Sequence, residues 1–88
     1  MQKTRPCLVI SPDQMNENLD TVIIAPMTTA ERSYPSRVSI VFQGKRGQVG
    51  LEQLRAVDHK RLIRKLGSLP SRMAEAVSAV LVEMFTRD

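Results

Sequence analysis

Short apolar runs alternate with polar segments through the first half of the chain, a pattern that predicts β-strands. Residues 7–11 form an apolar run between two prolines, and residues 21–25 are rich in β-branched side chains and end at Pro26. Continuous apolar runs of this length favour strands that are covered on both faces. The polar segment between them, residues 13–20, is rich in Asn and Asp and predicts a surface loop.

A strict alternation follows at residues 37–42, where every second residue is Val, Ile or Phe and shares one face. That pattern is typical of a half-buried antiparallel strand. The Gly-Lys-Arg-Gly sequence at residues 44–47 predicts a tight basic turn, and residues 48–54 return as the next strand. These segments therefore predict a β-hairpin.

The second half of the chain changes to a helical period. Asp58 as N-cap and Gly67 just beyond the C-terminus enclose a predicted short basic helix. After Pro70, apolar residues recur three and four positions apart, which predicts one amphipathic helix. Its apolar stripe consists of Met73, Ala76, Val77, Val80, Leu81, Met84 and Phe85.

These elements predict a mainly β fold with α, in a single domain over residues 1–88. We expect a small, strongly bent antiparallel sheet or barrel, with one short helix and a C-terminal amphipathic helix packed on it. A chain of 88 residues buries little surface, so it needs disulfides, metal or oligomerisation for support. Cys7 is the only cysteine, which excludes an internal disulfide, and Cys7 with His59 falls short of a structural zinc site. Oligomerisation is therefore the remaining source of additional stability.

Amino-acid composition indicates the cellular compartment more clearly than it indicates the binding partners. The lone cysteine suits a reducing cytoplasm. The apolar runs are far shorter than the ~20 residues that a membrane helix needs, so we expect no membrane partner. The chain has 13 Lys and Arg against 9 Asp and Glu, a formal charge of +4. That excess favours a polyanionic partner only weakly, because many solvated surfaces carry as much charge.

Polar groups at the strand ends are the best candidates for chemistry. If the first two strands pair, Arg5 before the first and Thr28 after the second come close at one end of the sheet. An arginine guanidinium stays charged and can bind phosphate through two parallel hydrogen bonds. Further cations could extend a basic track for a nucleic-acid backbone: Arg32, Arg37, Lys45 and Arg46. The alternative is that Arg5 and Thr28 only complete strand ends and that the basic hairpin is solvated.

Three blocks of the sequence resemble one known family. Residues 4–12, TRPCLVISP, resemble the RP-x-(V/L)-V-(I/L)-(S/T)-P strand of the MazF/PemK toxins, or mRNA interferases. Residues 24–29, IAPMTT, followed by a Tyr-Pro pair, resemble the second signature, and residues 48–58, QVGLEQLRAVD, the third. The blocks occur in the family's order and spacing and span the chain.

The resemblance implies a CcdB/PemK-type SH3-like barrel that forms a homodimer. It also implies the toxin of a type II toxin–antitoxin system, a metal-independent endoribonuclease without a cofactor that cleaves single-stranded mRNA at specific sequences by 2′-OH attack. A cognate antitoxin protein would neutralise it. The family's catalytic arginine and threonine fall on Arg5 and Thr28. RNA-contacting positions fall on Thr29, Arg32 and Arg37, and Glu52, where many relatives have Asp, is a candidate for proton transfer or orientation.

The chain departs from the family at its front. Family members usually carry a first strand and a loop before the Arg-Pro signature, so the resemblance implies an N-terminally short member. Two alternatives follow. The chain could be an inactive relative that only binds an antitoxin, or a CcdB-like toxin that binds gyrase, although the Arg-Pro and Pro-x-Thr-Thr blocks look like the RNase branch.

Overall fold

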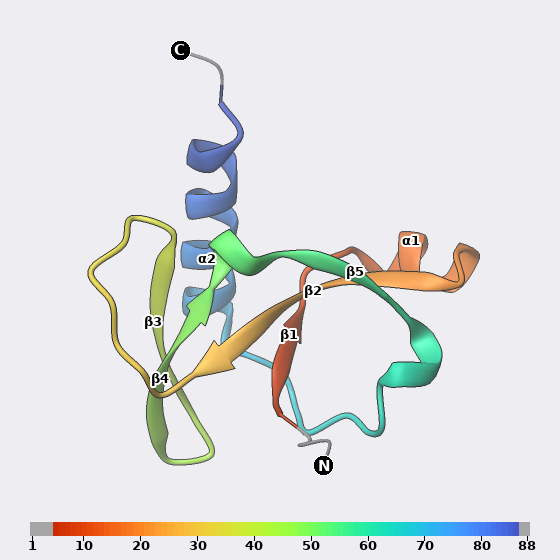
Figure 1. Ribbon diagram of the computed structural model, residues 1–88, viewed down its shortest axis with the longest axis horizontal. Helices are drawn as coiled ribbons and strands as arrows, with labels where there is room; N and C mark the ends of the chain where they lie inside the picture. Colours follow the sequence, from red (N-terminus) through yellow and green to blue (C-terminus); the bar gives the residue numbers. More distant parts are fainter. Residues whose placement is uncertain (1–4, 87–88) are drawn as a thin grey trace.

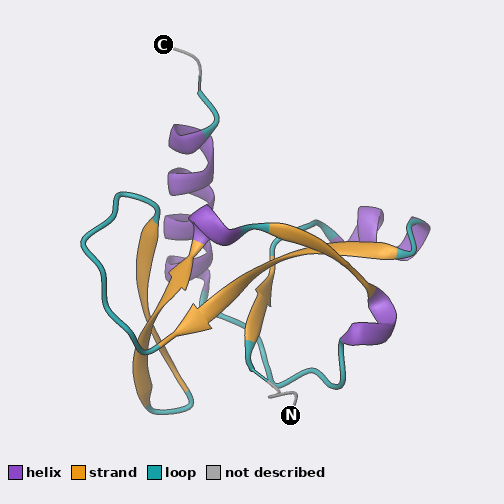
Figure 2. Cartoon of the chain, viewed as in Figure 1, coloured by secondary structure: helices purple, strands orange, loops and turns teal. Residues whose placement is uncertain are grey.

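A computed structural model describes residues 5–86 of the chain. Within that range the backbone forms a small curled antiparallel sheet and two α-helices (Figures 1 and 2). The elements, in chain order, are β1 (Cys7–Val9), α1 (Asp13–Asn18), β2 (Thr21–Thr28), β3 (Arg37–Phe42), β4 (Lys45–Gly50), the 3-10 turn η1 (Leu51–Gln53), β5 (Arg55–Asp58), the 3-10 turn η2 (His59–Arg61) and α2 (Ser71–Met84).

β2 is the longest strand and joins the two halves of the sheet. Along one side it pairs with β1, with Cys7 opposite Pro26. Along the other side it pairs first with β5 and then, near its end, with β4, where Met27 lies opposite Val49. β3 completes the β4 half of the sheet, and Figure 1 shows β2 running across from one half to the other. The predicted fold class, a strongly bent antiparallel sheet with a C-terminal helix, is confirmed.

The second strand was predicted to end at Pro26, and that boundary is wrong. β2 continues to Thr28 because Pro26 lies between the last residue paired with β5, Ile24, and the first paired with β4, Met27. The N–H of Met27 donates toward β1, to the oxygen of Pro6, so the nitrogen of Pro26 faces the gap between β5 and β4. A proline is tolerated where the ladder requires no donor.

The hairpin is confirmed, with a shifted turn and a shorter second strand. β3 has the predicted bounds, and Val38 and Ile40 are buried on its inner face. The turn lies at Gln43 and Gly44, which both have positive φ, as the commonest two-residue hairpin turns require. The predicted strand over residues 48–54 is interrupted, because the chain turns at η1 to bury Leu51 and then starts β5.

Two predicted segments outside the sheet are wrong. The polar segment predicted as a loop contains α1. Two hydrogen bonds tie the start of this helix to Ser11: the Ser11 hydroxyl donates to the side-chain oxygen of Asn16, and the side-chain nitrogen of Asn16 donates to the Ser11 carbonyl. The short basic helix predicted between Asp58 and Gly67 is limited to η2, although Asp58 does accept the N–H of Lys60 at 2.8 Å, as expected of an N-cap.

The chain after η2, residues 62–70, has no regular secondary structure (Figure 2). Leu62 packs against a small cluster of Val22, Ile24 and Val57, whereas Ile63 is 74% exposed. These neighbouring apolar residues therefore do not share a buried helical face. The cations of η2 and of this segment would also lie close together if both formed one helix: Lys60, Arg61, Arg64 and Lys65.

α2 packs against the inner face of the β3 half of the sheet. Val77, only 4% exposed, joins the main core, which includes Ala25, Val49 and Leu51. Most of the predicted apolar stripe surrounds that contact: Met73, Val80, Leu81 and Met84. Ala76 and Phe85 are exposed instead. For Phe85 the reason is that it lies beyond Met84, the last residue of the helix. Neither helix has the length and apolar character that crossing a membrane requires, within residues 5–86.

Candidate functional site

Two predicted site residues, Arg5 and Thr28, lie just before the start of β1 and at the end of β2. Thr28 is the last residue of β2 and pairs with Gln48 of β4. On its other side, the N–H of Met27 donates to the oxygen of Pro6 at 3.2 Å, which continues the β1–β2 register beyond β1. Arg5 directly precedes Pro6, so we expect it near Thr28 at this end of the sheet.

The hydroxyl of Thr28 also shapes the loop that follows. Its oxygen accepts the N–H of Ala30 at 3.1 Å, which turns the chain directly after β2. A hydroxyl that accepts in this way keeps its own O–H as a donor. Thr28 is half-buried, whereas Arg5 and Thr29 are exposed. The end of β2 therefore presents one hydroxyl donor, and Arg5, next to Pro6, is accessible to solvent.

Gln48 fastens the loop to the sheet. Its side-chain oxygen accepts the N–H of Arg32 at 3.0 Å, and its side-chain nitrogen donates to the oxygen of Arg32 at 3.2 Å. The guanidinium of Arg32 is exposed and donates to the neighbouring Glu31 carbonyl at 2.8 Å. The backbone of Arg32 is thus fixed while its charged end lies at the surface.

Arg37 lies beneath this loop, and its side chain is only 7% exposed. Two of its guanidinium nitrogens contact one carboxylate oxygen of Glu52, at 2.6 and 2.8 Å. The third donates to the Ala30 carbonyl at 3.3 Å and to the Gln48 side chain at 3.4 Å. The guanidinium also stacks 5.3 Å from the ring centre of Tyr34. Every nitrogen of this guanidinium already has a partner within the protein.

Glu52 is held as a carboxylate. Besides Arg37, it accepts the hydroxyl of Ser36 at 2.8 Å. The hydrogen bond from Arg37 is the main reason why the pKa of Glu52 falls to about 2, with a smaller contribution from Ser36. The same hydrogen bond raises the pKa of Arg37. At neutral pH this carboxyl has no proton to donate, and it is too weakly basic to compete well for one.

Two glycines of β4 leave room for these contacts. A Cβ atom at Gly50 would lie 3.4 Å from Nε of Arg37 and 3.6 Å from a carboxylate oxygen of Glu52. A Cβ atom at Gly47 would lie 2.7 Å from the backbone oxygen of Thr28, closer than such contacts allow. Gly47, which the sequence placed in the predicted turn, therefore sets how closely β4 approaches the end of β2.

The structure adds two residues that sequence reasoning did not select, Ser36 and Gln48, and it places Tyr34 of the Tyr-Pro pair against the guanidinium of Arg37. One feature of the sequence could have indicated Gln48 as a site residue: it is a polar residue beside the apolar Val49 in a predicted strand. Its partner, Arg32, is 16 positions away in the sequence. That contact depends on the pairing of β4 with β2, and no local pattern encodes it.

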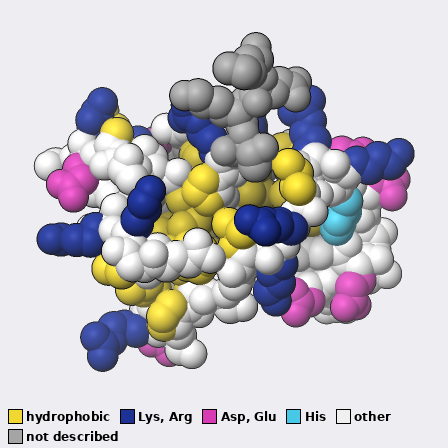
Figure 3. All heavy atoms as spheres, turned by 90° about the horizontal axis from the view of Figure 1, so that it is seen from below, with side chains coloured by type: hydrophobic (Ala, Val, Ile, Leu, Met, Phe, Trp, Pro, Cys, Tyr) yellow, Lys and Arg dark blue, Asp and Glu magenta, His cyan; other side chains and the backbone are white. Residues whose placement is uncertain are grey.

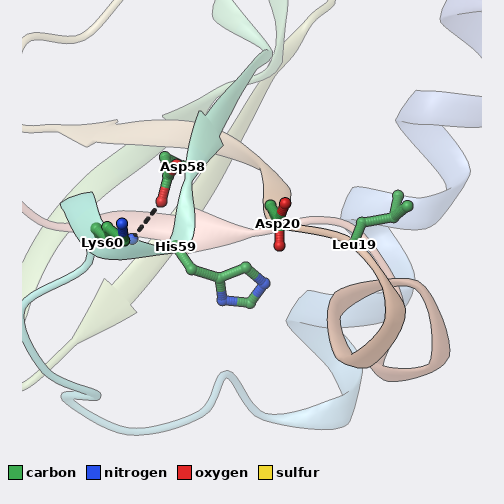
Figure 4. A pocket seen from close by; sticks show the side chains of 5 residues that line it. All are labelled: Leu19, Asp20, Asp58, His59 and Lys60. Atoms are coloured by element: carbon green, nitrogen blue, oxygen red, sulfur yellow. Dashed lines mark hydrogen bonds between the residues drawn. The ribbon is translucent and has the colours of Figure 1, made fainter.

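A hollow at the opposite end of β2 is a weaker candidate (Figure 4). It is lined by Leu19, Asp20, Asp58, His59 and Lys60. Figure 4 shows Asp58 directed to the backbone of Lys60, the capping bond already described. His59 is hydrogen bonded to the carbonyl of Asn16 at 2.9 Å. Within residues 5–86, no three His, Cys, Asp or Glu side chains gather as metal ligands.

The basic residues do not collect in one stripe. On the face seen in Figure 3, Lys and Arg side chains stand at several separate places with apolar side chains between them. The net charge of +4 therefore does not by itself mark a binding surface on this face. The ends of β1 and β2, with the loop after β2, remain the best candidate site because specific side chains meet there.

Comparison with known proteins identifies the same family as the sequence motifs. The family model of PemK-like, MazF-like toxins of type II toxin–antitoxin systems matches residues 1–85. No curated protein sequence matches the chain. Among solved structures, the Mycobacterium tuberculosis toxin MazF-mt6 superimposes with a TM-score of 0.84 at 22% identity, covering 96% of this chain and 88% of that one.

Two further structures have the same fold. An endoribonuclease from a mycobacterial species, solved with its cognate antitoxin, has a TM-score of 0.84 at 18% identity, covering 96% of this chain and 84% of that one. The MazE–MazF structure from Deinococcus radiodurans has a TM-score of 0.78 at 27% identity, covering 91% of this chain and 80% of that one. The chain therefore belongs to the PemK-like, MazF-like family of toxins of type II toxin–antitoxin systems.

Proposed function

We propose that this toxin is an endoribonuclease that cleaves single-stranded mRNA at specific sequences, with Arg5 and Thr28 as its catalytic residues. The observation that carries the proposal is the β1–β2 register, whose last backbone hydrogen bond, from Met27 to Pro6, lies one residue from both Thr28 and Arg5. The similar mycobacterial structure named as an endoribonuclease supports it. The family match supports this activity over that of a CcdB-like gyrase-binding toxin.

In the proposed reaction, the 2′-hydroxyl of the RNA attacks the adjacent phosphorus, and the bond from phosphorus to the 5′-oxygen breaks. The products are a 2′,3′-cyclic phosphate and a 5′-hydroxyl. Arg5 stabilises the charge that builds on the phosphoryl oxygens, because a guanidinium binds two of them at once. Thr28 donates its O–H to orient the phosphate. Water accepts the proton of the 2′-hydroxyl and supplies one to the leaving 5′-oxygen, since Arg5 is exposed to solvent.

The loop after β2 supplies the RNA contacts in this proposal. Thr29 and Arg32 are exposed on it and offer a hydroxyl and a guanidinium to the RNA. For Arg37 we propose a supporting role beneath the loop in place of a phosphate contact, because its nitrogens are taken by Glu52, Ala30 and Gln48. For Glu52, whose pKa of about 2 excludes service as a general acid, we propose orientation of Arg37.

We propose that the partners are a second copy of the chain and a cognate antitoxin. For the antitoxin, the support is that one similar structure is named as a mycobacterial endoribonuclease in complex with its cognate antitoxin and another as MazE–MazF from D. radiodurans. We place the activity in the cytoplasm, where mRNA is the substrate and where the free thiol of Cys7 stays reduced.

The test is cleavage of a single-stranded RNA library in the presence of a chelator. We expect products that end in a 2′,3′-cyclic phosphate, and we expect Arg5→Ala and Thr28→Ala each to lower the rate by at least about 100-fold, as loss of a transition-state donor does. Thr28→Ser keeps the hydroxyl and should keep most of the activity. Arg61→Ala removes an exposed cation at the far end of β2 and is the control.

Two outcomes would contradict the proposal. Cleavage that survives both alanine substitutions would show that other residues perform the chemistry. A folded chain that binds an antitoxin but cleaves no RNA would be the inactive relative that the sequence left open.

A further inference from the structure

Gln48 occupies a position that links the proposed catalytic end of β2 to the loop beyond it. Its backbone lies in β4, opposite Thr28 on one side and Ser39 of β3 on the other. Its side chain makes two hydrogen bonds to the backbone of Arg32: the side-chain oxygen accepts the Arg32 N–H at 3.0 Å, and the side-chain nitrogen donates to the Arg32 carbonyl at 3.2 Å. One residue therefore contacts both the strand that carries Thr28 and the loop that carries Arg32.

The chemistry of this contact requires a side-chain amide. The Gln48 oxygen accepts an N–H while its nitrogen donates to a C=O of the same residue, so donor and acceptor are both used. A glutamate would keep the acceptor but would set a carboxylate oxygen against the Arg32 carbonyl. An alanine would remove both bonds and also the bond that the Gln48 oxygen accepts from Arg37 at 3.4 Å.

The loop has few other attachments. It has no regular secondary structure over residues 29–34. Its backbone is held near its start by Thr28 and Arg37, which both bond to Ala30, and at its end by the N–H of Arg37, which donates to the Tyr34 carbonyl at 3.0 Å. Gln48 holds the middle. A loop held at both ends by other residues would still be free to move at Arg32 without this contact.

We propose that Gln48 is a positioning residue that fixes Arg32 relative to Thr28 and thereby determines which RNA sequences bind well enough to be cleaved. This inference rests on the proposed ribonuclease function. Gln48 acts through Arg32 and does not itself touch the scissile phosphate, so its loss affects RNA binding and sequence selection more than the chemical step.

The first experiment needs no RNA. Tyr34 is the only tyrosine and the chain has no tryptophan, so its fluorescence anisotropy reports on this loop directly. In Gln48→Ala we expect lower anisotropy and amide exchange at residues 29–34 that is faster by about tenfold, because the variant loses two neutral hydrogen bonds to Arg32 and a longer one from Arg37. Exchange in α2 should not change. Gln14→Ala, on the exposed surface of α1, is the matched control.

The second experiment measures cleavage of a preferred RNA sequence and of single-base variants of it. For Gln48→Ala we expect KM for the preferred sequence to rise about tenfold with kcat within about twofold, and discrimination among sequences to fall, as expected for lost positioning of a binding group. Gln48→Glu, which keeps the acceptor, should lie between wild type and Gln48→Ala. It also serves as the test protein if the alanine variant does not fold.

The outcomes separate this inference from the function on which it rests. If the wild type cleaves RNA but the Gln48 variants match it in loop exchange and in sequence preference, the inference is wrong. A fall in kcat as large as that of Arg5→Ala, with KM unchanged, would also overturn it. If the wild type cleaves no RNA, the proposed function fails and the role of Gln48 in RNA selection fails with it, while faster loop exchange would still establish the contact as the loop's attachment.

Discussion

The guanidinium of Arg37 makes hydrogen bonds through all three of its nitrogens, to Glu52, Ala30 and Gln48. Arg32 and Arg5, by contrast, are exposed at the same end of the sheet. These three arginines are equal in any count of charge, but they differ in what they can still bind. At the scale of single residues, the proposed site therefore combines two exposed cations, Arg5 and Arg32, with one cation whose side chain is buried, Arg37.

The pair of Arg37 and Glu52 predicts a pH-dependent contribution to stability. The pKa of Glu52 is about 2 in the folded chain and about 4.3 for an ordinary glutamate. Because the folded value is the lower one, the contribution is complete above about pH 5 and is lost as the pH falls toward 2. Since Glu52 is partly exposed and solvent screens the pair, we expect about 1 kcal/mol in the free energy of unfolding at pH 7.

Urea unfolding of wild type and Glu52→Gln at pH 7 and near pH 2 measures this contribution. The substitution should destabilise the chain at pH 7 and make little difference near pH 2. Glu83→Gln, on the exposed side of α2, is the control. A deficit of Glu52→Gln that is as large near pH 2 as at pH 7 would show that the ion pair is not its cause.

At the scale of elements, β2 and β4 determine where the site forms. Thr28 pairs with Gln48 at the end of β2, and Gly47 lies beside that pair with no side chain. The loop after β2 can fold back over β4 only because the two strands approach this closely. The geometry of the site thus depends on the pairing of β2 with β4, and within that pair on Gly47, which has no side chain.

Gly47→Ala tests that dependence. The added Cβ would lie 2.7 Å from the Thr28 oxygen, which is backbone and cannot rotate away, so β2 and β4 must separate. We expect a loss of about 1–3 kcal/mol in the free energy of unfolding, typical of overpacking, measured by urea unfolding. Ser39→Ala, at an exposed position of β3, should change it by less than about 0.5 kcal/mol. Equal stabilities of Gly47→Ala and wild type would refute the close approach.

At the scale of the whole molecule, stability depends on α2 covering the curled sheet. Val77 is the helix residue that reaches the buried core, at 4% exposure, whereas Val82 on the same helix is 68% exposed. Removing two methyl groups from Val77 leaves a cavity in the core, whereas removing them from Val82 leaves none because that side chain is already in contact with solvent. The same substitution at two positions of one helix therefore separates burial from helix propensity.

We expect Val77→Ala to lower the free energy of unfolding by about 2 kcal/mol and Val82→Ala to change it by less than about 0.5 kcal/mol. Urea unfolding of both variants at pH 7 checks this. Equal losses would mean that α2 does not pack as described.

The segments that could be predicted from sequence are those whose pattern is local. The apolar runs, the alternation in β3 and the stripe of α2 each encode burial over a few residues, because side-chain direction repeats every two residues in a strand and every 3.6 in a helix. Prediction failed where a distant partner decides the outcome. β2 passes through Pro26 because the ladder requires no donor there, and residues 62–70 remain irregular because Leu62 packs against the sheet while Ile63 does not.

The candidate site divides in the same way. The sequence by itself determined the family and the mainly β fold, and it supplied Arg5 and Thr28 as the proposed catalytic pair, because motifs and strand boundaries are encoded in consecutive positions. Only the tertiary structure decided that Arg37 pairs with Glu52, 15 positions away, and that Gln48 holds Arg32, 16 positions away. Such contacts depend on strand register and on the path of a loop, and both are products of the folded sheet as a whole.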